Sequence, residues 1–162
     1  MRRIGGIILL AVALLFGSFM LTSANAHNND DDNSGESFKI NTISKQFKEV
    51  DLPPKGESLG DQIVFSDDVY YRGKLVGSLD GVCTVTRLDP KANEGHQQCV
   101  VTVSLPKGTL TSQGVIVFRG EEVSGFTIAV TGGTGRYSDA GGEAHVEFVS
   151  DTRTNIHVVL DD

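Results

Sequence analysis

The clearest β-strand signal lies in residues 60–77, which read GDQIVFSDDVYYRGKLVG. Between residues 61 and 71 apolar and polar side chains alternate with a period of two, as in a strand with two different faces. One face carries Ile63, Phe65, Asp67, Val69 and Tyr71. Gly73 follows, and a second β-rich run begins at Lys74. We therefore expect a tight turn at Gly73 between two antiparallel strands.

The same pattern continues along the chain. From Ser37 onward no helical period is found, and short runs rich in β-branched residues are separated by glycine and proline. The expected strands are 37–50, 61–71, 74–88, 97–105, 113–118, 123–131, 143–149 and 154–160. The strands have an apolar face and a mixed face, and either could point inward. Eight antiparallel strands suffice to close a β-barrel without exposed edges, with room for one small ligand. The predicted fold class is all-β, an eight-stranded antiparallel β-barrel.

The chain begins with a segment typical of export. Arg2 and Arg3 precede an almost unbroken apolar run over residues 4–21, and residues 24–26, Ala-Asn-Ala, match a signal-peptidase site. Residues 1–26 are therefore predicted to be a signal peptide. The alternative is an uncleaved membrane anchor, because the apolar run is near spanning length. After cleavage the protein would be secreted or otherwise extracytoplasmic, with no membrane attachment.

The mature chain divides into a tail and one domain. Residues 27–36 are polar and rich in Asp and Asn, a composition that cannot bury apolar area, so we expect a disordered acidic tail. Residues 37–162 are long enough for one barrel domain. The net charge of −7 argues against a nucleic-acid partner, because such partners need a basic surface.

Export also determines the expected redox state of the two cysteines. Outside the cell thiols are oxidised, which predicts a disulfide between Cys83 and Cys99, the alternative being two free buried thiols. Residues 89–93 are rich in turn formers, and a hairpin centred on Lys91 places each cysteine eight residues from the centre. The bond would be a structural staple worth about 3 kcal/mol for a loop of about 15 residues.

Two segments of the sequence are similar to a known family. The first covers residues 60–70, 73–77 and 81–84, and the second is residues 130–142, VTGGTGRYSDAGG. Together they resemble the dirigent and allene oxide cyclase-like β-barrel superfamily, especially its exported bacterial members, over about residues 38–160. The resemblance implies an eight-stranded barrel with a central cavity, often assembled as a homotrimer. It also implies a pocket for a small hydrophobic or phenolic metabolite, with neither a metal nor an organic cofactor.

The second segment departs from the family pattern at two positions. Gly141 stands where plant dirigent proteins commonly have a pocket arginine, and Arg136 stands where some members have a pocket acid. No counterpart of the glutamate, asparagine and cysteine set of the cyclases is evident. The resemblance therefore implies the barrel and its cavity rather than either plant reaction.

Candidate pocket residues follow from the alternation in residues 61–71. Asp67 and Asp68 must point to opposite faces, so one of them should line the interior. A carboxyl in an apolar cavity has a raised pKa and suits general acid–base work, whereas a carboxyl at the rim would form only a salt bridge. The other candidates are polar groups that could orient a ligand and apolar wall residues: Tyr70, Tyr71, Arg87, Phe65, Phe126 and Phe148. No residue is assigned a catalytic role.

Other motifs give no site. His145 and His157 lie on neighbouring expected strands with Glu143 and Glu147 close in sequence, a set that could bind a metal, but a polar sheet face is the favoured interpretation. Residues 132–135, Gly-Gly-Thr-Gly, lack the Lys-Ser/Thr of a phosphate loop. No nucleophile motif is found, so no metal or covalent chemistry is expected.

Two functions of different classes fit these observations. The first is a secreted protein that binds a small apolar or phenolic metabolite in the barrel and guides its cyclisation or coupling, as a cofactor-independent cyclase or isomerase if it turns over. The second is a non-catalytic secreted structural or interaction protein with a filled barrel. The interior distinguishes them, because the first needs a lumen with polar side chains.

Overall fold

The computed structural model describes residues 36–120, 123 and 125–161. The expected signal peptide and all of the expected tail except Glu36 lie outside the described residues. Within the described part, no helix is both long and apolar enough to span a membrane.

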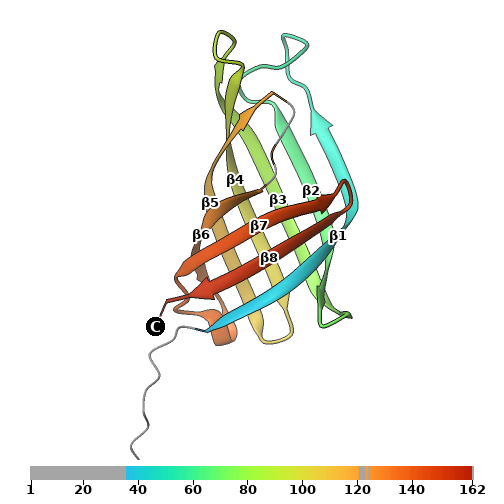
Figure 1. Ribbon diagram of the computed structural model, residues 1–162, viewed down its shortest axis with the longest axis vertical. Coiled ribbons are helices and arrows are strands. Elements are labelled where there is room, and N and C mark those ends of the chain that lie inside the picture. The colour runs from blue at the N-terminus through green and yellow to red at the C-terminus, as the bar shows by residue number, and fades with distance from the viewer. Residues whose placement is uncertain (1–35, 121–122, 124, 162) are drawn as a thin grey trace, which may run out of the picture. The chain divides into compact units, whose positions relative to one another are not determined.

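Eight strands pair in sequence order and close into one barrel, as predicted (Figure 1). The strands are β1 (Ser37–Val50), β2 (Gln62–Tyr71), β3 (Lys74–Asp89), β4 (Glu94–Leu105), β5 (Gly108–Arg119), β6 (Gly125–Gly133), β7 (Gly142–Ser150) and β8 (Arg153–Leu160). All neighbours are antiparallel, and β1 pairs with β8 to complete the ring. β4 begins earlier than expected because residues 94–96 pair with residues 87–89. β5 also begins earlier, because residues 108–112 pair with residues 101–105 although they lack a hydrophobic run.

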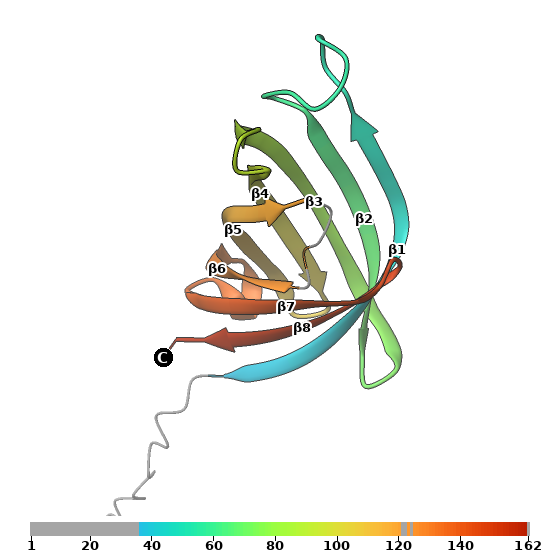
Figure 2. The same ribbon diagram turned by 45° about the horizontal axis from the view of Figure 1, so that its top comes forward.

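The two ends of the barrel differ. The connections β1–β2, β3–β4, β5–β6 and β7–β8 lie at one end, which we call the open end and which is uppermost in Figure 1. The remaining connections and the short helix η1 (Gly135–Tyr137) lie at the other, the closed end. β1 to β5 are longer than β6 to β8, so that they extend past the shorter strands at the open end (Figure 2).

The turn expected at Gly73 is confirmed. Tyr71 pairs with Lys74, which leaves two residues in the turn, and both have positive φ, 50° at Arg72 and 76° at Gly73. Positive φ at both central positions is the type I′ geometry that matches the twist of a hairpin. The turn fixes the pairing of Tyr71 with Lys74 and of Tyr70 with Leu75, and a bulge then shifts the register by one residue from Val69 onward.

The apolar face of each strand points inward. The buried core is formed by side chains from every strand, including Ile40, Val69, Leu79, Ile128, Val158 and Leu160. Two Phe–Gly cross-strand pairs shape the interior: Phe65 faces Gly81 and Phe118 faces Gly95. A Cβ at either glycine would collide with the opposite ring. The glycines are therefore required by close approach of an aromatic ring.

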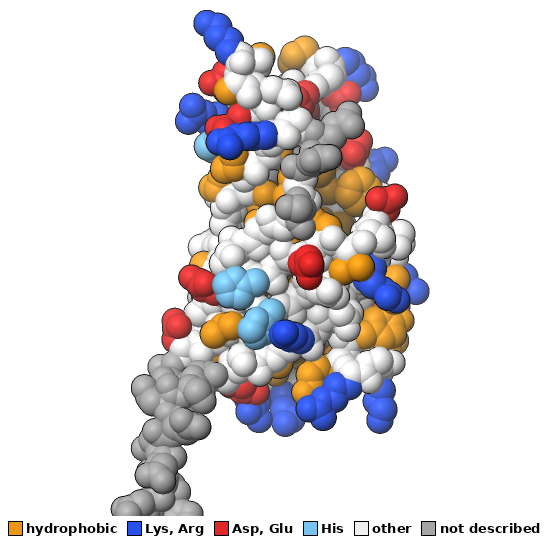
Figure 3. Space-filling model, in the orientation of Figure 1, with side chains coloured by type: hydrophobic (Ala, Val, Ile, Leu, Met, Phe, Trp, Pro, Cys, Tyr) orange, Lys and Arg blue, Asp and Glu red, His pale blue; other side chains and the backbone are white. Residues whose placement is uncertain are grey.

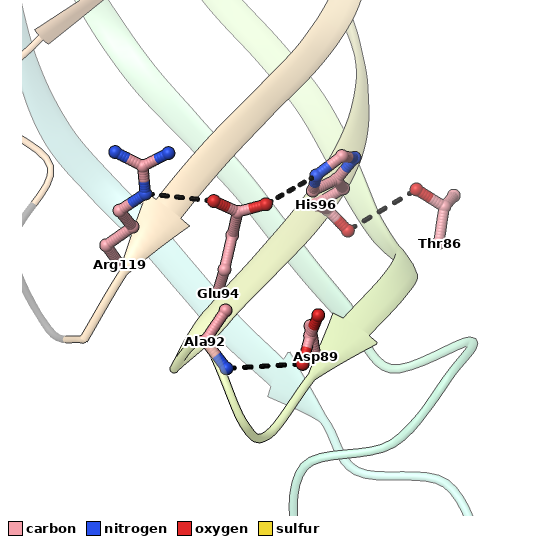
Figure 4. Close-up of polar contacts among 6 residues, drawn as sticks. All are labelled: Thr86, Asp89, Ala92, Glu94, His96 and Arg119. Atoms are coloured by element: carbon pink, nitrogen blue, oxygen red, sulfur yellow. Dashed lines mark hydrogen bonds and ion pairs between the residues drawn. The ribbon is translucent and has the colours of Figure 1, made fainter.

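A polar network holds the open end of β3, β4 and β5 on the outer face of the barrel (Figure 4). Glu94 accepts a hydrogen bond from Arg119 Nε at 2.9 Å and lies 3.3 Å from His96 Nε2. These two partners lower the pKa of Glu94. In the adjoining turn the Asp89 carboxylate accepts a hydrogen bond from the Ala92 amide. The network thus joins the tip of the β3–β4 hairpin to β5.

The disulfide predicted between Cys83 and Cys99 is confirmed, and so is the hairpin that brings the two residues together. They are directly opposite each other in the β3–β4 ladder, with a Cα–Cα distance of 4.0 Å. Both side chains are buried and face the interior. The bond therefore links two central strands from within the barrel.

Removal of this bond should lower stability without changing the fold. The Cys83→Ala/Cys99→Ala double variant should lose about 3 kcal/mol of unfolding free energy, the value for a loop of about 15 residues. Urea unfolding of the oxidised protein and the double variant, followed by far-UV circular dichroism, measures the difference. Equal midpoints would mean that the bond does not constrain the unfolded chain.

Candidate functional site

The barrel encloses a cavity of about 350 Å³. All eight strands contribute to its lining, and so do Val123 in the β5–β6 loop and the β7–β8 turn at residues 150–152. Both of these connections lie at the open end, so the cavity has its mouth there. Its volume is at the lower limit of the roughly 300–1,000 Å³ typical of ligand sites. The cavity therefore fits a small molecule.

The wall is mainly apolar and aromatic. Four phenylalanines line it: Phe47, Phe65, Phe126 and Phe148. The rings of Phe126 and Phe148 are 5.9 Å apart and tilted by 52°, a favourable edge-to-face type of contact. The cystine described above forms another part of the wall. Such a surface suits the flat faces of an aromatic or polyene ligand.

Asp67 places a carboxyl group in this apolar wall. Its side chain is half-buried, and Oδ2 accepts a hydrogen bond of 2.9 Å from the hydroxyl of Thr42 on β1, which is 1% exposed. No second side-chain partner of the carboxyl is found in the described part of the chain. Every buried polar side-chain atom there has a partner, so the unpaired Oδ1 is open to the cavity.

The electrostatic surroundings of Asp67 favour its protonated form. Burial raises the pKa of the carboxyl most, and the charges of Asp80 and Asp68 raise it further, while the Thr42 hydrogen bond acts in the opposite direction. No cation is among the causes of this shift. A carboxyl held in this way exchanges protons at a higher pH than an exposed aspartate.

Several neutral polar groups that the sequence did not reveal also line the cavity. They are Thr42, Ser44, Gln97, Ser112, Ser150, Thr152 and Thr154. Ser112 is only 8% exposed, and it belongs to the lining, so a ligand in the cavity would lie beside its hydroxyl. Alternation with a period of two shows which residues of a strand share a face. Which of the two faces points into the barrel is shown only by the way the strands pair and close.

A β-bulge in β1 shapes the mouth. The register against β2 shifts between Ser44 and Gln46, so that Lys45 is the extra residue. Ser44 and Phe47 consequently both line the cavity although they are three positions apart. Phe47 is 61% exposed and stands at the opening. Simple alternation cannot assign residues beyond such a bulge.

The structure separates the candidate residues into two groups. Asp67 lines the cavity together with Phe65, Phe126 and Phe148. Asp68 points to the outer face, where its carboxylate lies 3.0 Å from Lys45 Nζ. This separation follows from the alternation of neighbouring residues on β2.

The other three candidates do not line the cavity. Tyr70 shares the outer face with Asp68 and pairs with the exposed Asn41. Tyr71 ends β2, is 37% exposed and lies beside the Arg72 guanidinium, 5.2 Å from the ring centroid. Arg87 is exposed beyond a bulge in β3. The structure thus brings four of the eight candidates together at the cavity.

The histidine pair lies on the outside of the barrel. His145 and His157 are opposite each other on β7 and β8, with ring centroids 5.9 Å apart (Figure 3, pale blue). Thr127 Oγ1 lies 2.9 Å from His145 Nδ1, and His145 Nε2 lies 3.8 Å from Glu143. Across the described residues no cluster of three or more His, Cys, Asp or Glu side chains could hold a metal ion. His27 is outside the described residues.

The glycine-rich segment closes the far end of the barrel. Tyr137 in η1 is 9% exposed, and its ring lies 6.4 Å from that of Phe38. Arg136 binds the Glu36 carboxylate at 2.8 Å and thereby holds the start of β1. Gly141 follows in the same connection. Neither Arg136 nor Gly141 lines the cavity, so the two departures from the family pattern lie outside it.

The sequence matches the model of the allene oxide cyclase barrel-like domain over residues 38–160. The chain belongs to this family. No curated protein matches the sequence significantly. Among solved structures, a pyocyanin demethylase shares 27% identity and covers 77% of this chain and 99% of its own, with a TM-score of 0.67.

Two further solved structures show the same fold at lower identity. A pterocarpan synthase dirigent protein is 17% identical, with a TM-score of 0.60 over 77% of this chain and 83% of its own. The Diels-Alderase AbmU from Streptomyces koyangensis is 16% identical, with a TM-score of 0.61 over 80% of this chain and 69% of its own. The barrel is therefore common to proteins with different reactions.

The buried carboxyl should make stability depend on pH. The folded pKa of Asp67 is raised above its ordinary value of 3.8, so the folded state holds the proton to a higher pH than the unfolded chain does. Stability consequently falls as pH rises through the interval between the two values. Asp67→Asn should raise Tm by roughly a few degrees at pH 7 and lose this advantage as the pH approaches 3.8.

Asp68→Asn is the matched control, because it removes the same charge from the outer face. Loss of its exposed pair with Lys45 should change Tm little. Thermal unfolding of both variants across this pH range makes the comparison. A pH-independent Tm difference between Asp67→Asn and the parent protein would contradict the raised pKa.

Proposed function

We propose that the protein is a secreted barrel that binds one small apolar or phenolic metabolite and guides its cyclisation or a related isomerisation without a cofactor. The proposal rests on one observation above all. An apolar cavity contains a half-buried carboxyl, Asp67, with one oxygen fixed by Thr42 and the other open to a ligand. This arrangement combines a shaped surface with a group that transfers protons.

The wall residues would select the reactive conformation. Phe65, Phe126 and Phe148 come from three different strands and bound a small volume, so a flexible precursor would be held folded rather than extended. Confinement of this kind lowers the entropic barrier to ring closure. Ser112 and Gln97 offer hydrogen bonds that would fix the orientation of a polar substituent.

Asp67 would act as a general acid or base. Its raised pKa brings proton exchange nearer to neutral pH, where such catalysis is most effective. In an isomerisation the carboxyl donates or accepts one proton and regains its starting state, so that atoms and electrons balance without a co-reactant. Oxidative phenol coupling would need an external oxidant in addition. The carboxyl of Asp67 in the cavity favours isomerisation, because that reaction needs a proton donor and acceptor.

The relatives support this class of function at a general level. The solved structures include a dirigent synthase and a Diels-Alderase, both similar to this chain in fold. The alternative is a non-catalytic secreted protein with a barrel filled by its own side chains. The hollow interior favours ligand binding over that alternative. A homo-oligomer, expected from the family resemblance, stays a prediction.

Native mass spectrometry of protein purified from its own host tests the proposal. We expect the mass of a chain without residues 1–26, two hydrogens lighter through the disulfide, with an additional small molecule bound. The same spectrum gives the number of subunits. Retention of the molecule should fall in Asp67→Asn and persist in Asp68→Asn, because only Asp67 faces the cavity.

The isolated molecule then allows a test of turnover. Its precursor should be converted by the parent protein and by Asp68→Asn, and at least about tenfold more slowly by Asp67→Asn, since a lost general acid or base typically costs a factor of 10² to 10⁴. Ligand-free spectra for the parent and both variants would instead support the non-catalytic alternative.

A further inference from the structure

The ionisable side chains among the described lining residues of the cavity all carry charge of the same sign. The ionisable side chains in its lining are two carboxyls, Asp67 in the wall and Asp151 at the mouth. Among the described lining residues there is no lysine, arginine or histidine. The remaining polar lining groups are neutral hydroxyls and one amide. The described part of the lining therefore supplies no cation to balance a negative charge brought into the cavity.

Two carboxylates on the outer face of the barrel add to the negative charge near the cavity. Asp68 and Asp80 lie close enough to Asp67 to affect its charge, and both act as negative groups. Lys45 binds Asp68 at 3.0 Å on the outer face and is 55% exposed, so its ammonium group belongs to the solvent side. Ser66 and Ser78 hold the two oxygens of Asp80, again on the outside. Asp68 and Asp80 thus add negative charge on the outer side of the wall near Asp67.

The aromatic residues of the wall also favour a cation over an anion. A phenylalanine ring carries partial negative charge on its faces and attracts cations, an effect that strengthens away from water. Four such rings line the cavity. A carboxylate facing aromatic rings is the combination by which proteins recognise organic ammonium and N-heterocyclic cations.

We infer that the cavity selects a flat aromatic amine or N-heterocyclic cation and excludes carboxylates. The inference rests on the proposed function and narrows its apolar or phenolic metabolite to one that also carries an amine or a ring nitrogen. The cationic or N–H group would bind Oδ1 of Asp67, while the rings contact Phe65, Phe126 and Phe148. The volume of about 350 Å³ fits on the order of two or three fused rings.

An anionic ligand would be unfavourable for a physical reason. A carboxylate loses its hydration on entering the cavity and finds no cation to replace it, and it is also repelled by Asp67. A cation loses hydration too, but gains a charge-assisted hydrogen bond and contacts with the ring faces. Selectivity is the difference between the binding free energies of the cation and the anion. It therefore depends on the charge of Asp67 more than on the shape of the wall.

Three probes of nearly the same shape separate charge from shape: 9-aminoacridine, a cation at pH 7; acridine, which is neutral; and acridine-9-carboxylate, an anion. Isothermal titration at pH 7 and moderate salt gives their affinities for the disulfide-bonded protein. We expect one site per chain, with the cation bound at least about tenfold more tightly than the anion. Neutral acridine should lie between them.

Asp67→Asn and Asp68→Asn are the decisive pair, because each removes one negative charge and changes non-specific attraction equally. Asp67→Asn should reduce the cation-to-anion ratio to about threefold or less and leave the affinity for neutral acridine within about twofold. Asp68 lies outside the cavity and is paired with Lys45, so Asp68→Asn should lower the ratio far less than Asp67→Asn does. The retained acridine affinity also shows that the Asp67→Asn variant is folded.

The outcomes separate this inference from the function on which it rests. If acridine binds but the anion binds as tightly as the cation, the charge selectivity is wrong and the binding cavity stands. The same conclusion follows if both variants reduce the ratio equally, because the preference would then come from overall charge. If none of the three probes binds, this inference fails, and the native mass spectrum decides separately whether the cavity binds another small molecule.

Discussion

Closure of the hydrogen-bonded ladder between β1 and β8 is the constraint on which the rest of the structure depends. The pairing runs from Ser37 with Val159 to Ile43 with Arg153, and it turns an open meander into a ring. A closed ring has an inside and an outside, so period-two alternation becomes a division between interior and solvent. Without it the same apolar residues would form one face of an open sheet with two exposed edges.

Closure alone would allow a filled barrel, and the hollow follows from the side chains placed inside. The inward face includes glycines opposite aromatic rings, as at Gly81 and Gly95, and these rings lie flat against the wall. The closed end is packed with Ile40, Val69, Tyr137 and Leu160, whereas the mouth is bordered by the β7–β8 turn and Phe47. The cavity is therefore a cup with a packed base.

The features that the sequence predicted depend on patterns among residues close together in the chain. The eight strands, the turn at Gly73 and the hairpin joining Cys83 to Cys99 all follow from residue types close together in the chain. It also predicted that one of Asp67 and Asp68 would be interior, because neighbours on a strand point to opposite faces.

The features that the sequence could not predict depend on how neighbouring strands pair. The bulge at Lys45 turns Phe47 inward, and the bulge between Val85 and Arg87 interrupts alternation before Arg87, so the face of each residue beyond a bulge is not readable from period two. The hydroxyl of Thr42 reaches Asp67 only because β1 and β2 are in one particular register. Long-range register, not residue type, accounts for these gaps.

The position of Asp67 is difficult to explain by stability alone. A carboxyl in an apolar wall loses hydration, and in this barrel it gains one hydroxyl hydrogen bond and no cation. The outer neighbour Asp68 obtains the ion pair that Asp67 lacks. An apolar residue at position 67 would continue the core formed by Phe65 and Val69 on either side. A destabilising group in the wall of an open cavity is typical of a site retained for function, since such sites trade stability for chemistry.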